Sequence, residues 1–145
     1  MDALAMNVRI DESDVMRRIK DTCSFRNVGL SGDISDLEAK KALAEHSAYV
    51  ILGAELIDQL PDTNDCEFLV TLNFGVALVA RSYRLNVADA VEHLKPMRES
   101  LRESMRAWRP DQCDRIELEG GEMMRTGAEL SVWFERFSVS YQISV

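Results

Sequence analysis

The sequence contains few of the residues that indicate a disordered, fibrous or disulfide-stapled protein. Of its 145 residues only seven are glycine and three are proline, and no stretch has low complexity. Disordered and collagen-like chains are rich in those residues. Its three cysteines, Cys23, Cys66 and Cys113, are far apart and odd in number, which argues for reduced, buried thiols and against a disulfide framework. We therefore expect one globular domain over residues 1–145.

Long hydrophobic runs and an excess of positive charge are absent as well. No stretch approaches 18 consecutive apolar residues, and no basic segment followed by an apolar run opens the chain, so we expect neither a membrane span nor a signal peptide. The 17 basic and 25 acidic residues give a net charge of −8, which opposes nonspecific binding to nucleic acid. These features predict a protein that folds in the cytoplasm, has no membrane partner and does not bind DNA nonspecifically.

Residues arranged for catalysis or metal binding are also missing. His46 and His93 are the only histidines, and neither lies at ligand spacing from a second histidine or a cysteine. No glycine-rich phosphate loop occurs. Ser31 lies between Gly29 and Gly32 without the glycine spacing of a nucleophile elbow, so we interpret it as part of a turn. The sequence thus predicts no enzyme, no cofactor and no metal site.

One acidic pair needs a separate interpretation. Glu99 and Glu103 are one helical turn apart and could share a metal ion or a proton. They alternate, however, with Arg98, Arg102 and Arg106. Pairing of Glu with Arg inside one helix accounts for all five residues, at only about 0.3–0.5 kcal/mol per pair. We favour that interpretation.

What the sequence does contain is a strong period of two. Apolar residues take every second position over residues 67–81 and again from residue 133 to the last residue, which is typical of strands with one buried face. Two long strands with matching alternation should pair antiparallel. Residues 48–56 are apolar on consecutive positions and predict a strand covered on both faces. Residues 24–35 predict a short strand or an extended turn.

Two amphipathic helices complete the pattern. The first begins at Asp11 or Ser13, either of which can cap the exposed amides of a helix. The second covers residues 86–108 and contains Pro96, which predicts either a bent helix or two helices that share a face. Residues 35–45 are either a short exposed helix or a mobile loop. The apolar stripe expected on the second helix consists of Val91, Leu94, Met97 or Arg98, Leu101, Met105 and Trp108.

A β-hairpin is expected between the second helix and the last strand. Its strands would be residues 115–118 and 122–125, with Gly120 and Gly121 as the tight turn. Together the elements predict an α+β fold of two layers, a mostly antiparallel sheet with two main helices on one face and a projecting hairpin. The unprotected margin of the C-terminal strand and an exposed Phe134 favour pairing with another chain. Alternatively, Phe134 and Trp133 only bracket the entry of that strand into the core.

The segments "LRESMRAWRPDQCDRIELEGGEMM" (101–124) and "SVWFERFSVSYQISV" (131–145) resemble the tail-terminator, or tail-completion, proteins of long-tailed bacteriophages, including the Mu-like group. With the strand "VTLNFGVALVAR", the resemblance covers about residues 48–145. The motif residues that carry it are Trp108, Pro110, Gly120, Gly121, Trp133 and Tyr141.

Members of this family are similar to the lambda tail terminator, whose α/β fold forms a hexameric ring at the head-proximal end of the tail tube. The resemblance implies a virion structural protein that ends tube polymerisation, contacts the tail tube protein and the head-completion or neck connector protein, and lets genome DNA pass through its lumen without specific binding. It implies a place in the neck region of the virion, and in the host cytoplasm during assembly. Another phage neck or head–tail joining component, or a small cytosolic hydrolase, remains as an alternative.

A closed ring needs two different patches on each subunit. We expect the oligomer and tube interfaces in the 35–45 segment, at the sheet edge and in the loops at 58–65 and 82–86. The interface residues expected there are Leu37, Lys40, Lys41, Asp62, Asn64, Tyr83, Arg84, Phe134 and Arg136.

Overall fold

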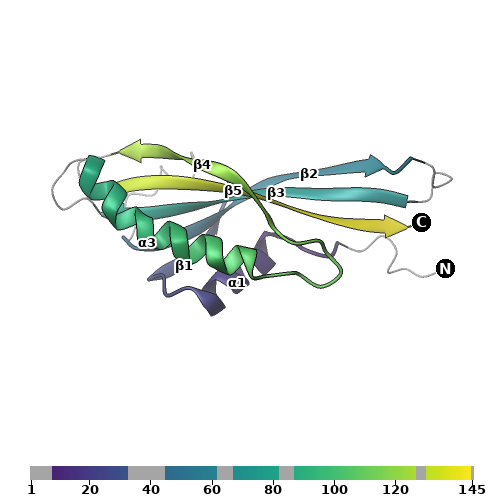
Figure 1. Ribbon diagram of the computed structural model, residues 1–145, viewed down its shortest axis with the longest axis horizontal. Helices are drawn as coiled ribbons and strands as arrows, with labels where there is room; N and C mark the ends of the chain where they lie inside the picture. Colours follow the sequence, from purple (N-terminus) through teal and green to yellow (C-terminus); the bar gives the residue numbers. More distant parts are fainter. Residues whose placement is uncertain (1–7, 33–44, 62–66, 82–86, 127–129, 145) are drawn as a thin grey trace.

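The computed structural model describes residues 8–32, 45–61, 67–81, 87–126 and 130–144 (Figure 1). The strands form one five-stranded sheet in the order β1-β2-β3-β5-β4, in which β1 and β2 are parallel and all other neighbours are antiparallel. Both helices lie on one face of this long, twisted sheet. The predicted α+β fold with two layers is therefore confirmed. In chain order the elements are α1 (Glu12–Thr22), β1 (Asn27–Ser31), β2 (Ser47–Gln59), β3 (Glu67–Arg81), α3 (Val87–Arg106), β4 (Glu117–Thr126) and β5 (Leu130–Ser144).

The two helices begin and end close to where the sequence indicates. Asp11 caps α1 in a capping box: its side chain accepts from the Asp14 amide at 3.0 Å, and the Asp14 side chain accepts from the Asp11 amide at 3.0 Å. The single helix α3 continues through Pro96. Val91 was wrongly expected in the buried stripe, because it is 46% exposed and Ala90 is buried instead. The steps from Ala90 to Leu94 and on to Met97 keep these residues on one face of a helix with 3.6 residues per turn. Two successive steps of three residues, from Val91 to Leu94 and Met97, would rotate away from that face.

Strands β3 and β5 form the centre of the sheet. They pair over fifteen residues, from Glu67 opposite Ser144 to Arg81 opposite Leu130, which confirms the predicted antiparallel pair. The single buried face expected for β3 holds only in its first half, because residues 76–80 are all buried. The reason is a second apolar cluster on the sheet face opposite the helices, formed by Ile51, Ala77, Val79 and Val132. The main core, on the helix face, holds most other buried residues.

Strand β2 differs from its prediction in its second half. Its first five residues are mostly buried, as expected, but residues 52–59 are all exposed. Asp58 and Gln59, which belong to the loop expected at 58–65, still pair with β3. Strand β2 therefore continues beyond its buried residues, so its first part is buried and its second part is exposed.

The expected turn at Gly120 and Gly121 is wrong, because β4 continues through both residues and pairs with β5 on either side. The register shifts between Leu118 and Gly120, where Gly120 has φ +116°, a conformation that suits a bulge. A side chain at Gly121 would lie 2.8 Å from the indole nitrogen of Trp133. The glycine pair thus bends β4 around a tryptophan instead of reversing the chain.

Candidate functional site

The sheet extends beyond the helices as a three-stranded arm (Figure 1). The arm consists of residues 54–59 of β2, 67–73 of β3 and 138–144 of β5. Strand β1 pairs with β2 only as far as Ile51, and β4 pairs with β5 only as far as Ser138. Within the described residues, the outer edges of β2 and β5 in the arm therefore have no neighbouring strand. The predicted open margin of β5 is largely absent, because β5 lies between β3 and β4 over most of its length, and in the arm its Ser140 carbonyl oxygen accepts from the Asp114 amide at 2.8 Å.

A bulge in β2 marks the start of the arm. Ile51 pairs with Gly75 and Ala54 with Asn73, so Leu52 and Gly53 together face a single residue of β3. The Gly53 amide donates to the Glu12 carboxylate at 3.0 Å. A Cβ at Gly53 would lie 1.6 Å from the carbonyl oxygen of Asn73. The bulge thus needs a glycine, and the first residue of α1 fixes the point where the arm begins.

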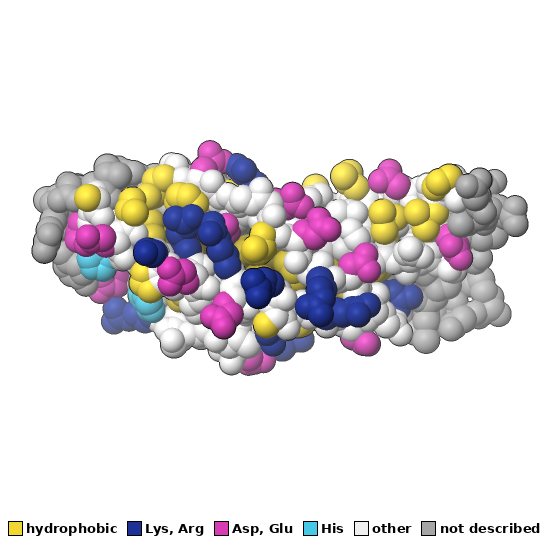
Figure 2. Space-filling view, in the orientation of Figure 1, with side chains coloured by type: hydrophobic (Ala, Val, Ile, Leu, Met, Phe, Trp, Pro, Cys, Tyr) yellow, Lys and Arg dark blue, Asp and Glu magenta, His cyan; other side chains and the backbone are white. Residues whose placement is uncertain are grey.

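The outer strand of the arm carries apolar side chains in the open. Leu56 is 56% exposed and Ile57 is 55% exposed, and as consecutive strand residues they point to opposite faces. Exposed acidic side chains, Glu55 and Asp58, flank them. We call residues 55–58 the β2 margin. Figure 2 shows hydrophobic side chains interspersed with Asp and Glu over this end of the molecule. Such an edge is a site for pairing with another chain.

The outer strand on the opposite side of the sheet, β4, is protected against such pairing. Its register with β5 shifts twice, at Leu118/Gly120 and at Met123/Arg125. Exposed glutamates, Glu117, Glu119 and Glu122, follow its length. Bulges and charges both discourage strand pairing at a sheet edge. The exposed part of β2 and the outer strand β4 are therefore not equivalent.

A second surface feature is a groove of about 380 Å³ between the N-terminal segment, α1 and the chain that follows α3. We call it the arginine groove. The Arg18 guanidinium lies 5.9 Å from the centre of the Trp108 ring and donates to the Ser104 carbonyl oxygen at 3.2 Å. Arg17 pairs with Asp14 at 3.4 Å. The groove is lined by Arg9, Ile10, Asp14, Arg17, Arg18, Asp21, Trp108, Pro110 and Asp111.

Two guanidinium nitrogens in this groove lack an acceptor. The Nε atoms of Arg9 and Arg18 are buried and have no hydrogen-bond partner in the part of the chain that the structure describes. Buried charged donors are normally paired. The Tyr141 hydroxyl is hydrogen-bonded to the backbone of Arg9, and burial raises the pKa of Tyr141. Burial likewise raises the pKa of the Cys113 thiol, partly offset by Arg9.

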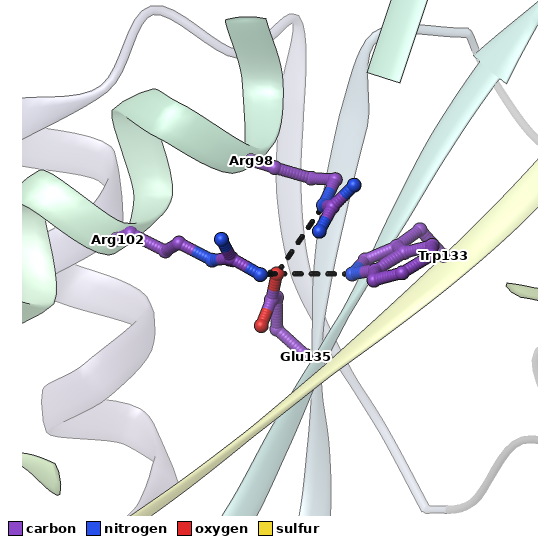
Figure 3. A network of polar contacts seen from close by, with 4 residues as sticks. All are labelled: Arg98, Arg102, Trp133 and Glu135. Atoms are coloured by element: carbon purple, nitrogen blue, oxygen red, sulfur yellow. Dashed lines mark hydrogen bonds and ion pairs between the residues drawn. The ribbon is translucent and has the colours of Figure 1, made fainter. Parts of the chain in front are cut away.

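A buried ionic network connects α3 to β5 (Figure 3). The Glu135 side chain is 2% exposed, and its Oε1 accepts from the Trp133 indole at 3.0 Å. Arg102 donates to the same oxygen through Nη2 at 2.7 Å, and Arg98 through Nε at 3.4 Å. The Arg98 guanidinium also stacks 3.7 Å from the centre of the Trp133 ring. Two arginines and an indole thus surround one carboxylate.

This network corrects the expected pairing of Glu and Arg inside α3. Arg98 and Arg102 reach across to Glu135 instead of pairing with Glu99 or Glu103. The carboxylate of Glu135 is buried beneath the helix, where the effective dielectric constant is lower than in water. It therefore attracts the two arginines more strongly than a solvated glutamate would. The network is therefore a structural connection between helix and sheet.

Of the interface residues predicted from the sequence, Phe134 and Arg136 can be placed. Both lie on β5 and line a groove of about 510 Å³ that also borders Gly75 and Asn73. Arg136 lies over the Phe134 ring at 5.7 Å and pairs with Glu122. Leu37, Lys40, Lys41, Asp62, Asn64, Tyr83 and Arg84 lie outside the described residues.

The motif residues are distributed over three places. Trp108 and Pro110 line the arginine groove, and Tyr141 lies beside it. Gly120 and Gly121 form the bulge of β4, and Trp133 joins the Glu135 network. Sequence reasoning missed the β2 margin and the arginine groove. An apolar pair between two acidic residues was the available signal for the margin.

Among the described residues, no group of three or more His, Cys, Asp or Glu side chains is arranged to hold a metal ion. Neither helix in the same part of the chain combines the length and apolar character needed to cross a bilayer.

Comparison with known proteins gives one match over nearly the whole chain. The sequence model of a family described as "Phage tail terminator protein" matches residues 6–145. The match includes the N-terminal third of the chain, which the resemblance noted above left out. No curated protein matches the chain.

Proposed function

The chain belongs to the phage tail terminator family, and from this premise we propose that it acts as a single domain that assembles with five further copies into a ring on the head-proximal end of the tail tube. The observation that carries the proposal is the family match over residues 6–145. It confirms the suspected family. A structural role in the phage tail follows from membership.

The surfaces of the chain support a ring. The arm has an open margin on β2 among the described residues, whereas the outer edge of β5 is partly occupied by the chain before β4, since the Asp114 amide donates to the Ser140 carbonyl oxygen. Cyclic assembly requires two different patches on each subunit, and the β2 margin is proposed as one of them. A net charge of −8 per subunit, repeated around a lumen, discourages adhesion of passing DNA. The proposed ring ends tube polymerisation on one side and receives the neck connector on the other. The groove beside Phe134 and Arg136 is the proposed tube contact.

A polymerisation assay tests this function. Tail tube protein is polymerised with and without the purified chain, and tube lengths are measured by electron microscopy. We expect the purified chain to shorten the tubes even when it is added in far smaller amounts than the tube protein, because each ring blocks one growing end. Unchanged lengths with no chain at tube ends would refute the proposal. Binding to the head connector without binding to tubes would instead favour another head–tail joining component.

A further inference from the structure

The two ends of strand β2 differ in charge. The acidic β2 margin lies near its last residue, and a groove of about 280 Å³ lies at its start. We propose that the β2 margin of one copy binds in this groove of the next copy. The inference rests on the proposed ring and names one contact within it. We call the groove the histidine groove, and its charged and histidine residues are Arg26, Glu45, His46, Arg81 and His93.

The arm carries charge of one sign only. In the described part of the arm the charged side chains are those of Glu55, Asp58 and Glu67, and all three are acidic. The sequence contains no lysine or arginine over positions 42–80 or 137–145. A surface that is acidic throughout repels other acidic surfaces and attracts a partner that presents cations in excess. The β2 margin therefore favours a basic contact surface.

The histidine groove offers more cations than carboxylates. Arg26 and Arg81 share the single carboxylate of Glu45, at 3.8 and 3.4 Å. Both distances exceed the roughly 2.7–2.9 Å of a charge-assisted hydrogen bond, and the two arginine side chains are 66% and 46% exposed. Asp89, the acidic neighbour of His93, is buried and does not line the groove. An incoming carboxylate therefore meets one positive charge in excess and guanidinium groups that it can reach.

His46 holds the groove in place with an unusual backbone conformation. Its φ is +57°, in the left-handed region that residues other than glycine rarely adopt. Its carbonyl oxygen accepts from the Arg26 amide at 2.8 Å, and its ring packs edge-on against Phe25. These contacts bring Arg26 beside Glu45. Backbone strain persists only where the surroundings enforce it, and it clusters at binding sites, so the conformation of His46 is a second sign of a site.

The two surfaces cannot meet within one molecule. The groove adjoins the first residue of β2 and the margin lies near its last, which places them roughly 30 Å apart along an extended strand. In Figure 2 the His side chains lie at the left end of the molecule, and hydrophobic side chains interspersed with Asp and Glu lie at the right end. The contact therefore joins different copies. Because its halves are two different patches, it repeats head to tail until a ring closes.

Charge reversal tests the contact. We expect Glu55→Lys with Asp58→Lys, and separately Arg26→Glu with Arg81→Glu, to weaken self-association about 100-fold, because like charges then face each other. An equal mixture of the two variants should associate again, because the margin of each then fits the groove of the other. This rescue also shows that both variants fold. Sedimentation velocity measures each step.

Cross-linking without a spacer provides a readout that identifies the contact residues. In Arg26→Lys with Arg81→Lys both charges remain, and each position gains a primary amine. A carbodiimide joins an amine to a carboxylate only where the two groups touch. We expect it to link position 26 or 81 to Glu55 or Asp58 of another copy. Mass spectrometry of a mixture of isotope-labelled and unlabelled chains distinguishes links between copies from links within one copy.

The matched control for the margin is Glu99→Lys with Glu103→Lys, which makes the same charge change on exposed positions of α3 and should leave self-association unchanged. Wild-type rings that persist in both charge reversals would overturn this contact and leave the ring intact. A margin variant that forms rings but no longer binds tail tubes would assign the margin to the tube protein and likewise overturn the contact. A wild-type chain that stays monomeric at millimolar concentration would overturn both proposals.

Discussion

Glu135 and the side chains around it explain how a charged residue can lie inside the interface between helix and sheet. Its Oε1 accepts three hydrogen-bond donors, so the cost of removing the carboxylate from water is offset by charge-assisted bonds. Gly121 leaves room for the Trp133 indole that supplies one of them. The position of the helix on the sheet therefore depends on single residues of β4 and β5.

Replacing Glu135 by alanine should destabilise the fold strongly. The change leaves two arginines facing a low-dielectric site without a counter-charge, and we expect a loss of about 3 kcal/mol in the free energy of unfolding. This is the lower end of the usual range, because the side chains of Arg98 and Arg102 remain 26% and 42% exposed. Urea unfolding measures the loss. Glu122→Ala, which breaks the exposed pair with Arg136, is the control and should cost less than about 1 kcal/mol.

The stability of the fold should also fall at alkaline pH. Burial raises the pKa of Cys113 above its ordinary value of 9.0 and that of Tyr141 above 10.0. Above pH 9 the unfolded chain loses these protons first, so the folded chain binds more protons and the free energy of unfolding decreases as pH rises. Urea unfolding between pH 7 and 11 measures this. In Tyr141→Phe the part of the decrease above pH 10 should shrink, and an unchanged slope would contradict the assignment.

At the scale of elements, the molecule is shaped by bulges. The bulge at Leu52 and Gly53 separates the covered half of β2 from the arm, and the bulges of β4 protect the opposite outer strand. A bulge bends a strand and increases its twist. The long central pair of β3 and β5 passes through both regions without a register shift. One continuous sheet can therefore form both a core under the helices and an arm beyond them.

A side chain at Gly53 should disrupt the start of the arm. A Cβ there would meet the Asn73 carbonyl oxygen at 1.6 Å, and backbone atoms must move to relieve the clash. We expect Gly53→Ala to cost about 2 kcal/mol or more in unfolding free energy. Differential scanning calorimetry of this variant and of Leu52→Ala makes the comparison. Leu52 belongs to the same bulge and is exposed, so its loss should stay within about 0.5 kcal/mol.

The elements that the sequence predicted well are those whose signal is local. The alternation along β3 and β5 and the cap at Asp11 depend on neighbouring residues only. Gly120 and Gly121 were assigned to a turn because a glycine pair serves turns and bulges alike. Which one forms depends on Trp133 in another strand. The two arginine partners of Glu135 lie 33 and 37 residues away in the chain, and no period in the sequence reports such a contact.

The surface features were harder to predict for the same reason. The β2 margin becomes visible only when the sheet order leaves residues 52–59 without an outer neighbour in the described chain. The arginine groove is formed by Arg9, α1 and Trp108. Arg9 and Trp108 are about a hundred positions apart in the sequence, and several other elements lie between α1 and Trp108. Exposure of this kind is a property of topology. About the surface of the chain, composition alone predicted only that it does not bind DNA nonspecifically.

At the scale of the whole molecule, the chain combines a core covered by the helices with an arm in which β2 is exposed. The helices and the Glu135 network stabilise one half of the sheet, and the arm places apolar side chains of β2 in the open. A solitary protein would be expected to protect such an edge. The chain belongs to the phage tail terminator family, and the proposed assembly with sister copies would cover this edge. The ring is therefore the central claim about this chain.

Electron microscopy of the purified chain with preassembled tail tubes tests that claim most directly. The account predicts closed rings of uniform size in the protein alone, and one ring at a single end of each tube when the two are mixed. Averaged views should resolve six copies of the 16.4 kDa chain around an open lumen. Isolated monomers together with bare tube ends would contradict it.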